Sequence, residues 1–99
     1  MTMKRRPFRE RYGPWAVVAG ASEGLGAAFT REAARRGLNV VVIARREAPL
    51  IALAEQVRAE SGVEIAVLAS DLAADDAIER IVAATAGREV GLVIANAAT

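Results

Sequence analysis

The sequence predicts an α/β domain with a parallel β-sheet and helices on both of its faces. Apolar runs typical of buried strands alternate with longer stretches in which apolar residues recur at helical spacing. Such an alternation makes every strand-to-strand connection a helical crossover, and right-handed crossovers produce parallel strands. One apolar run, residues 39–44, has no charged residue, as expected for a strand buried on both faces. The expected sheet has four strands in the order 3-2-1-4, with three helices.

The individual elements follow from this pattern and from turn signals between them. We expect strands over residues 15–19, 39–44, 63–69 and 90–95, and helices over about residues 25–36, 47–60 and 75–86. The helical spacing predicts that the inward faces carry Leu25, Ala28, Phe29 and Ala33 in the first helix, Leu50, Leu53, Ala54 and Val57 in the second, and Ile78, Ile81, Val82 and Thr85 in the third.

Composition limits the class of protein. The chain has 99 residues, 54% of them hydrophobic and 25% charged, which fits one small globular domain. It contains neither Cys nor His, so we expect no disulfide and no metal site. No apolar run approaches the roughly 20 residues of a membrane span. We therefore expect a cytoplasmic protein without a membrane span.

Basic residues gather in the first twelve residues, ahead of the domain expected over residues 13–99. This N-terminal arm contains Lys4, Arg5, Arg6, Arg9 and Arg11. A tether for nucleic acid is one interpretation, but short terminal charge runs are usually solvated, and the net charge of the chain is only +1. We expect no nucleic-acid partner.

The turn after the first strand has the features of a phosphate cradle. Gly20, Gly24 and Gly26 separate an apolar strand from an Ala-rich helix. Residues without Cβ allow positive φ and let a phosphate approach the backbone, while the helix N-terminus offers N–H groups and a positive dipole end. A glycine-rich turn without a ligand is the alternative reading.

The spacing of these glycines resembles the short-chain dehydrogenase/reductase family, whose signature is Thr-Gly-x-x-x-Gly-x-Gly. The chain has Ala19 in place of the Thr. The resemblance extends over about residues 12–98 and implies a Rossmann-like fold, a nicotinamide cofactor and hydride transfer between that cofactor and a carbonyl or alcohol substrate. It implies that the pyrophosphate end of the cofactor is bound by Gly20, Ser22, Glu23, Gly24, Leu25 and Gly26.

The end of the second strand points to NADP rather than NAD. An acidic residue there usually holds the ribose 2′-OH of NAD, whereas this chain has Ala44 followed by Arg45 and Arg46. A guanidinium binds a 2′-phosphate through paired charge-assisted hydrogen bonds. Alternatively, the two arginines are solvated residues at the entry of the second helix. Glu23 counts against NADP if its charge points inward.

Two further motifs resemble those of the family at the ends of the third and fourth strands. Asp71 and Leu72 resemble an Asp-Val/Leu pair in which the carboxylate meets the adenine, although Asp71 alone also suits a turn. Asn96 and Ala97 match two positions of an Asn-Asn-Ala-Gly motif, whose other two positions are Ala95 and Ala98 here. These departures predict a slightly less rigid site.

No catalytic residue is predicted. The family uses a Ser and a Tyr-x-x-x-Lys motif after the fourth strand, whereas the only Tyr here is Tyr12 and the only Lys is Lys4. We therefore expect the cofactor-binding half of a larger reductase, inactive by itself, and the sequence looks most like reductases of 3-oxoacyl or keto-steroid substrates. A non-catalytic nucleotide-binding module is the alternative. Residues 90–95 should form an exposed edge through which copies of the chain associate.

Overall fold

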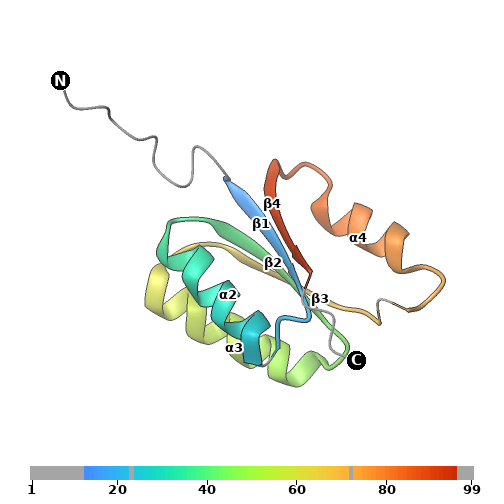
Figure 1. Ribbon diagram of the computed structural model, residues 1–99, viewed down its shortest axis with the longest axis horizontal. Helices are drawn as coiled ribbons and strands as arrows, with labels where there is room; N and C mark the ends of the chain where they lie inside the picture. Colours follow the sequence, from blue (N-terminus) through green and yellow to red (C-terminus); the bar gives the residue numbers. More distant parts are fainter. Residues whose placement is uncertain (1–12, 23, 72, 96–99) are drawn as a thin grey trace.

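The computed structural model describes residues 13–22, 24–71 and 73–95 and shows the predicted parallel α/β fold (Figure 1). The strands are β1 (Trp15–Ala19), β2 (Asn39–Ala44), β3 (Ile65–Ala69) and β4 (Val90–Ala95), and the helices are α2 (Gly24–Arg35), α3 (Glu47–Ser61) and α4 (Ala77–Thr85). The sheet order is β3-β2-β1-β4, and all pairings are parallel. The predicted strand order is therefore confirmed.

The third strand and the third helix each begin two residues later than predicted. Apolar residues form a strand only where they pair with a neighbouring strand, and acidic residues form a helix only where the backbone hydrogen bonds are helical. The third strand was expected from residue 63, but its ladder with β2 begins where Val40 N–H donates to the Glu64 carbonyl. The third helix was expected from residue 75, but the preceding residues form turns in which Ala74 N–H donates to Asp71 O and Ala77 N–H to Ala74 O. The expected basic arm, residues 1–12, lies outside the described residues.

The helices cover the two faces of the sheet unequally. Helices α2 and α3 lie on one face, where alternate residues of β1 and β2, including Val18, Val40 and Val42, pack against them. The opposite face, with Val17, Val41 and Ile43, contacts α4 through Ile81 and Ala84. All six residues of β2 are buried, as predicted for a strand covered on both faces.

Helix α3 buries the predicted residues Leu50, Leu53, Ala54 and Val57, whereas the prediction for α2 was only partly right: Ala33 is buried and Phe29 packs against the core. Leu25 is 61% exposed and Ala28 is exposed, whereas the buried side of α2 carries Gly26, Ala27, Thr30, Ala33 and Ala34. The reason is the close approach of Gly26 to the backbone of Gly20. This contact fixes the rotation of the helix, so residues four and seven or eight positions later also face the sheet.

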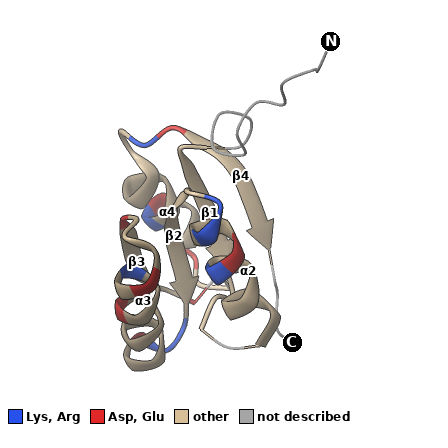
Figure 2. Ribbon diagram, turned by 90° about the vertical axis from the view of Figure 1, so that its left-hand side faces the viewer, with Lys and Arg blue, Asp and Glu red and all other residues tan. Residues whose placement is uncertain are grey.

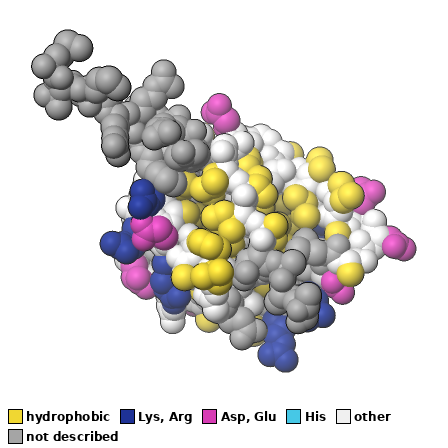
Figure 3. All heavy atoms as spheres, in the orientation of Figure 1, with side chains coloured by type: hydrophobic (Ala, Val, Ile, Leu, Met, Phe, Trp, Pro, Cys, Tyr) yellow, Lys and Arg dark blue, Asp and Glu magenta, His cyan; other side chains and the backbone are white. Residues whose placement is uncertain are grey.

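The prediction for α4 was also partly wrong. Ala77 is buried and Ile81 packs on the sheet, but Ile78 and Val82 are 75% and 61% exposed. Val93 of the edge strand β4 is 67% exposed as well. Figure 3 shows hydrophobic side chains on the surface between α2 and α4, where β4 runs. The predicted exposed edge at residues 90–95 is thus present in the described part of the chain.

Candidate cofactor site at the carboxyl edge of the sheet

The strand register brings the predicted site segments to one edge. Ala19 pairs with Ile43 and with Ala95, and Ala44 pairs with Ala69. Because all four strands are parallel, the segments that follow them leave the sheet on the same side. This is the edge at which ligands bind in open α/β sheets, next to the point where strand order reverses between β1 and β4.

The turn between β1 and α2 is held by the end of β2. The N–H groups of Gly20 and Ala21 both donate to the carbonyl oxygen of Ile43, at 2.8 and 3.0 Å. Gly20 and Gly24 have φ of 74° and 61°, in the left-handed region that favours glycine. The turn is therefore fixed to the sheet at the place where the site is expected.

Gly26 is required by a close backbone approach. A Cβ placed on it would lie 1.9 Å from the carbonyl oxygen of Gly20, which is backbone and has little freedom to move. The hydroxyl of Thr30, one turn further on, donates to the Gly26 carbonyl at 2.9 Å and is buried. The close approach of Gly26 to Gly20 sets the first turn of α2 against the strand end, so that its N–H groups lie beside the glycine turn.

The remaining turn residues lie at the surface of this cradle. Ser22 is half-buried, and Leu25 is exposed although it is apolar. Glu23 lies outside the described residues. The first turn of α2 contains no acidic residue, so no described carboxylate there competes with a bound anion.

The segment after β2 presents two free cationic side chains to solvent. Ala44 is buried, whereas Arg45 and Arg46 are exposed, and neither guanidinium makes a hydrogen bond or ion pair within the described ranges. Arg46 precedes α3 with extended backbone and makes no side-chain cap hydrogen bond. In Figure 2 this loop is drawn in blue beyond the arrowhead of β2. Both arginines can therefore bind an anion without first breaking a contact.

The segment after β3 is tied to the end of β2. The N–H of Ser70 donates to the carbonyl of Ala44 at 2.9 Å. Asp71 is exposed, and its Oδ1 accepts a hydrogen bond from the N–H of Ala73 at 2.9 Å. Asp71 therefore has the turn role that its sequence position also suits, and the hydrogen bond from Ala73 fixes the orientation of its carboxylate. Leu72, Asn96 and Ala97 lie outside the described residues.

Three contributors to the site carry no sequence signal or only a weak one. The carbonyl of Ile43 could have been supplied by any residue type, and Thr30 shows no sign in the sequence of bonding to Gly26. Ser70 is 3% exposed, and its hydroxyl has no hydrogen-bond partner among the described residues. A Ser at the end of a buried strand could have been noticed for its polarity alone.

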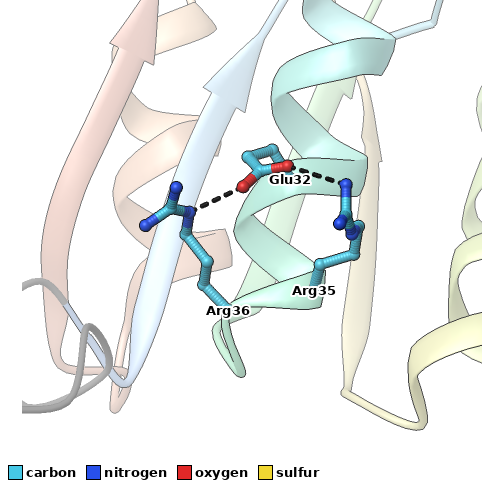
Figure 4. Close-up of polar contacts among 3 residues, drawn as sticks. All are labelled: Glu32, Arg35 and Arg36. Carbon is cyan, nitrogen blue, oxygen red and sulfur yellow. Dashed lines mark hydrogen bonds and ion pairs between the residues drawn. The ribbon is translucent and has the colours of Figure 1, made fainter.

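The charged cluster of α2 lies at the other end of that helix. Glu32 contacts Arg35 at 3.1 Å and Arg36 at 2.7 Å (Figure 4). The hydrogen bond from Arg36 lowers the pKa of the Glu32 carboxyl. This exposed cluster neutralises part of the basic C-terminal turn and stands apart from the cradle at Gly24.

Two kinds of feature are absent from the described residues. No group of three His, Cys, Asp or Glu side chains there could hold a metal ion. None of the described helices combines the length and apolar character needed to cross a membrane.

The sequence of the chain is similar to those of known oxidoreductases. The family described as short chain dehydrogenase matches residues 14–99. Over 86 residues, the chain is 44% identical to 7beta-hydroxysteroid dehydrogenase of Clostridium sardiniense, covering 87% of this chain and 33% of that protein. It is also 44% identical over 87 residues to very-long-chain 3-oxoacyl-CoA reductase of Podospora anserina, covering 85% and 26%. The expected likeness to steroid and 3-oxoacyl reductases is confirmed.

The solved structures agree with the fold. L-sorbose reductase of Gluconobacter frateurii, complexed with NADPH and L-sorbose, matches with a TM-score of 0.83 and 27% identity, covering 89% of this chain and 34% of that one. The chain spans between about a quarter and a third of the length of the curated relatives it matches.

Proposed function

We propose, from the premise that this chain belongs to the short-chain dehydrogenase family, that it forms the NADP(H)-binding portion of a reductase. The observation that carries the proposal is the contact between Gly26 and Gly20, where a Cβ would lie 1.9 Å from the carbonyl oxygen. A helix N-terminus that a residue without Cβ allows to pack this closely on a strand end is the arrangement that binds a pyrophosphate.

The proposed contacts with the cofactor fall at three places. The turn from Gly20 to Gly26 would hold the pyrophosphate, with Ser22 adding a hydroxyl contact and Glu23 and Leu25 lining the turn. Arg45 and Arg46 would bind the 2′-phosphate, and Asp71 the adenine. Leu72, Asn96 and Ala97 complete the proposed set of contacts. When bound, the nicotinamide supplies the hydride that is exchanged with a carbonyl or alcohol substrate.

The preference for NADPH over NADH rests on the segment after β2. Ala44 is buried and offers no carboxylate to a ribose 2′-OH, while the two arginines that follow it are exposed and have no hydrogen bond or ion pair with other described residues. A 2′-phosphate would gain charge-assisted hydrogen bonds there, and NADH would not. NADPH is the cofactor in the structure of L-sorbose reductase.

This chain alone is proposed to bind cofactor without turning over substrate. Its only Tyr, Tyr12, and its only Lys, Lys4, precede the glycine turn, so these 99 residues contain no Tyr-x-x-x-Lys motif. Hydride transfer is accordingly proposed for a protein of the relatives' length. The same observation supports the alternative, a nucleotide-binding module that does no chemistry.

The test is a titration of the chain with NADPH and with NADH, followed by nicotinamide fluorescence. We expect NADPH to bind more tightly, and the Arg45→Ala variant to lose about tenfold in NADPH affinity with little change for NADH. Arg35→Ala, which removes an exposed arginine at the opposite end of α2, is the matched control and should bind like the unaltered chain. Equal affinity for the two cofactors, or no loss in Arg45→Ala, would refute the NADP assignment.

A further inference from the structure

Two arginines cover the outer edge of β3. Arg58 of α3 donates from its guanidinium to the carbonyl of Ile65 at 2.6 Å, and Arg80 of α4 donates to the carbonyl of Ala69 at 3.0 Å. Ile65 and Ala69 are the first and last residues of the strand. The two bonds thus have the same chemistry but lie at opposite ends of β3.

The carbonyls of Ile65 and Ala69 point away from β2, toward the outer edge of the sheet. On the inner side, Glu64 accepts from Val40 N–H, and Ser70 donates to the Ala44 carbonyl. Because successive peptide groups of a strand alternate in direction, those of Ile65 and Ala69 face outward, where β3 has no neighbouring strand. Each guanidinium therefore satisfies an edge carbonyl that an additional strand would otherwise satisfy.

The bond from Arg80 lies next to the proposed adenine site. Ala69 is followed directly by Ser70, which is hydrogen-bonded to β2, and by Asp71, whose carboxylate is oriented by Ala73 N–H. Arg80 is anchored in α4, where its own N–H donates to Asp76 O at 3.0 Å. The loop that carries Asp71 is therefore closed at its base by a contact from the helix that follows it.

We propose that Arg80 is a positioning residue for the adenine end of the cofactor site. Arg80 ties α4 to the last residue of β3 and so fixes the start of the loop that presents Asp71. Arg58 ties α3 to the first residue of β3, at the end of the strand away from the site. This inference rests on the proposed function. It predicts that the two arginines, alike in chemistry, differ in their effect on cofactor binding.

The test compares Arg80→Ala, Arg80→Lys and Arg58→Ala in the full 99-residue chain. NADPH is titrated into each variant after circular dichroism has shown that it is folded. Arg80→Ala should raise the Kd for NADPH by about fivefold, which corresponds to the net contribution of one hydrogen bond. Arg80→Lys should recover part of the loss because an ammonium still donates to the carbonyl. Arg58→Ala should bind like the unaltered chain.

Fragments of the cofactor locate the effect. Arg80→Ala should weaken binding of AMP, which contains the adenine, and leave binding of nicotinamide mononucleotide unchanged. It should also speed amide exchange at Ala73, whose N–H is bonded to Asp71. Equal losses in Arg80→Ala and Arg58→Ala, or an equal loss for both fragments, would show a merely structural role and overturn the inference.

The two proposals fail in different ways. If the unaltered chain does not bind NADPH, the proposed function is wrong, and the role of Arg80 is refuted with it. If the unaltered chain binds NADPH and Arg80→Ala binds it equally well, only the positioning role is refuted.

Discussion

One face of the sheet is well covered by α2 and α3, and we call it the closed side. The opposite face is covered only in part by α4 and is exposed above all at the edge strand β4, and we call it the open side. On the closed side α2 and α3 bury most of the residues that face the sheet, and the glycine turn brings α2 against the strand end. On the open side Ile78, Val82 and Val93 are exposed, and α4 contacts the sheet through a few small or aliphatic side chains. The difference suggests that the cofactor cradle and the stability of the domain both depend mainly on the closed side.

The largest expected effect is that of Gly26→Ala on the closed side. The added Cβ would clash with the Gly20 carbonyl, and overpacking against backbone costs about 3 kcal/mol of unfolding free energy or more. NADPH binding should be lost as the turn is displaced. Urea denaturation and a cofactor titration measure the two effects.

Gly62→Ala is the control for that variant. Gly62 has φ of 74°, but a Cβ there would meet nothing within 4 Å. Its substitution should cost about 1 kcal/mol and leave NADPH binding intact. If the two variants were equally stable, the contact between Gly26 and Gly20 would not be the constraint described here.

A pair of aliphatic truncations compares the two sides directly. Leu50→Ala on α3 removes a fully buried side chain and should cost about 2–5 kcal/mol. Ile78→Ala on α4 removes one that is already exposed and should change stability by about 0.5 kcal/mol at most. Chemical denaturation gives both values. Similar costs for the two would mean that α4 packs as tightly as α3.

Val93→Lys should have the smallest effect on the free energy of unfolding, but it should reduce self-association of the chain. The edge strand β4 carries no charged residue, and such edges pair with other strands. We predict that the unaltered chain self-associates at tens of micromolar and that Val93→Lys shifts it toward monomer. Ile51→Lys, the same change on α3, should not. Sedimentation velocity showing a monomeric unaltered chain would contradict this prediction.

The sequence predicted those parts of the fold that depend on local rules. The strand positions, the parallel pairing and the buried face of α3 follow from apolar patterning and from the handedness of crossovers. The face of α2 followed only at Phe29 and Ala33, because a tertiary contact of Gly26 sets the rotation of the helix and leaves Leu25 and Ala28 exposed. On α4, Ile78 and Val82 fit a helical stripe but remain uncovered.

The site shows the same division. The glycine spacing and the basic pair after β2 were visible as residue types, since phosphate binding requires them. The carbonyls of Ile43 and Ala69 and the buried hydroxyl of Ser70 were not, because a backbone carbonyl carries no residue signature and a lone Ser has many roles. Only the register of the sheet brings them together.

The most direct test of the central claim is to map NADPH binding on the amide NMR spectrum of the chain. We expect shifts concentrated at the carboxyl edge of the sheet, at residues 20–26, at Arg45 and Arg46, and around Asp71. Amides at the opposite edge, such as those of Gly37, Gly62 and Glu89, should stay in place. No shift on adding NADPH, or shifts spread over α4 and that opposite edge instead, would contradict a cofactor site built on the glycine turn.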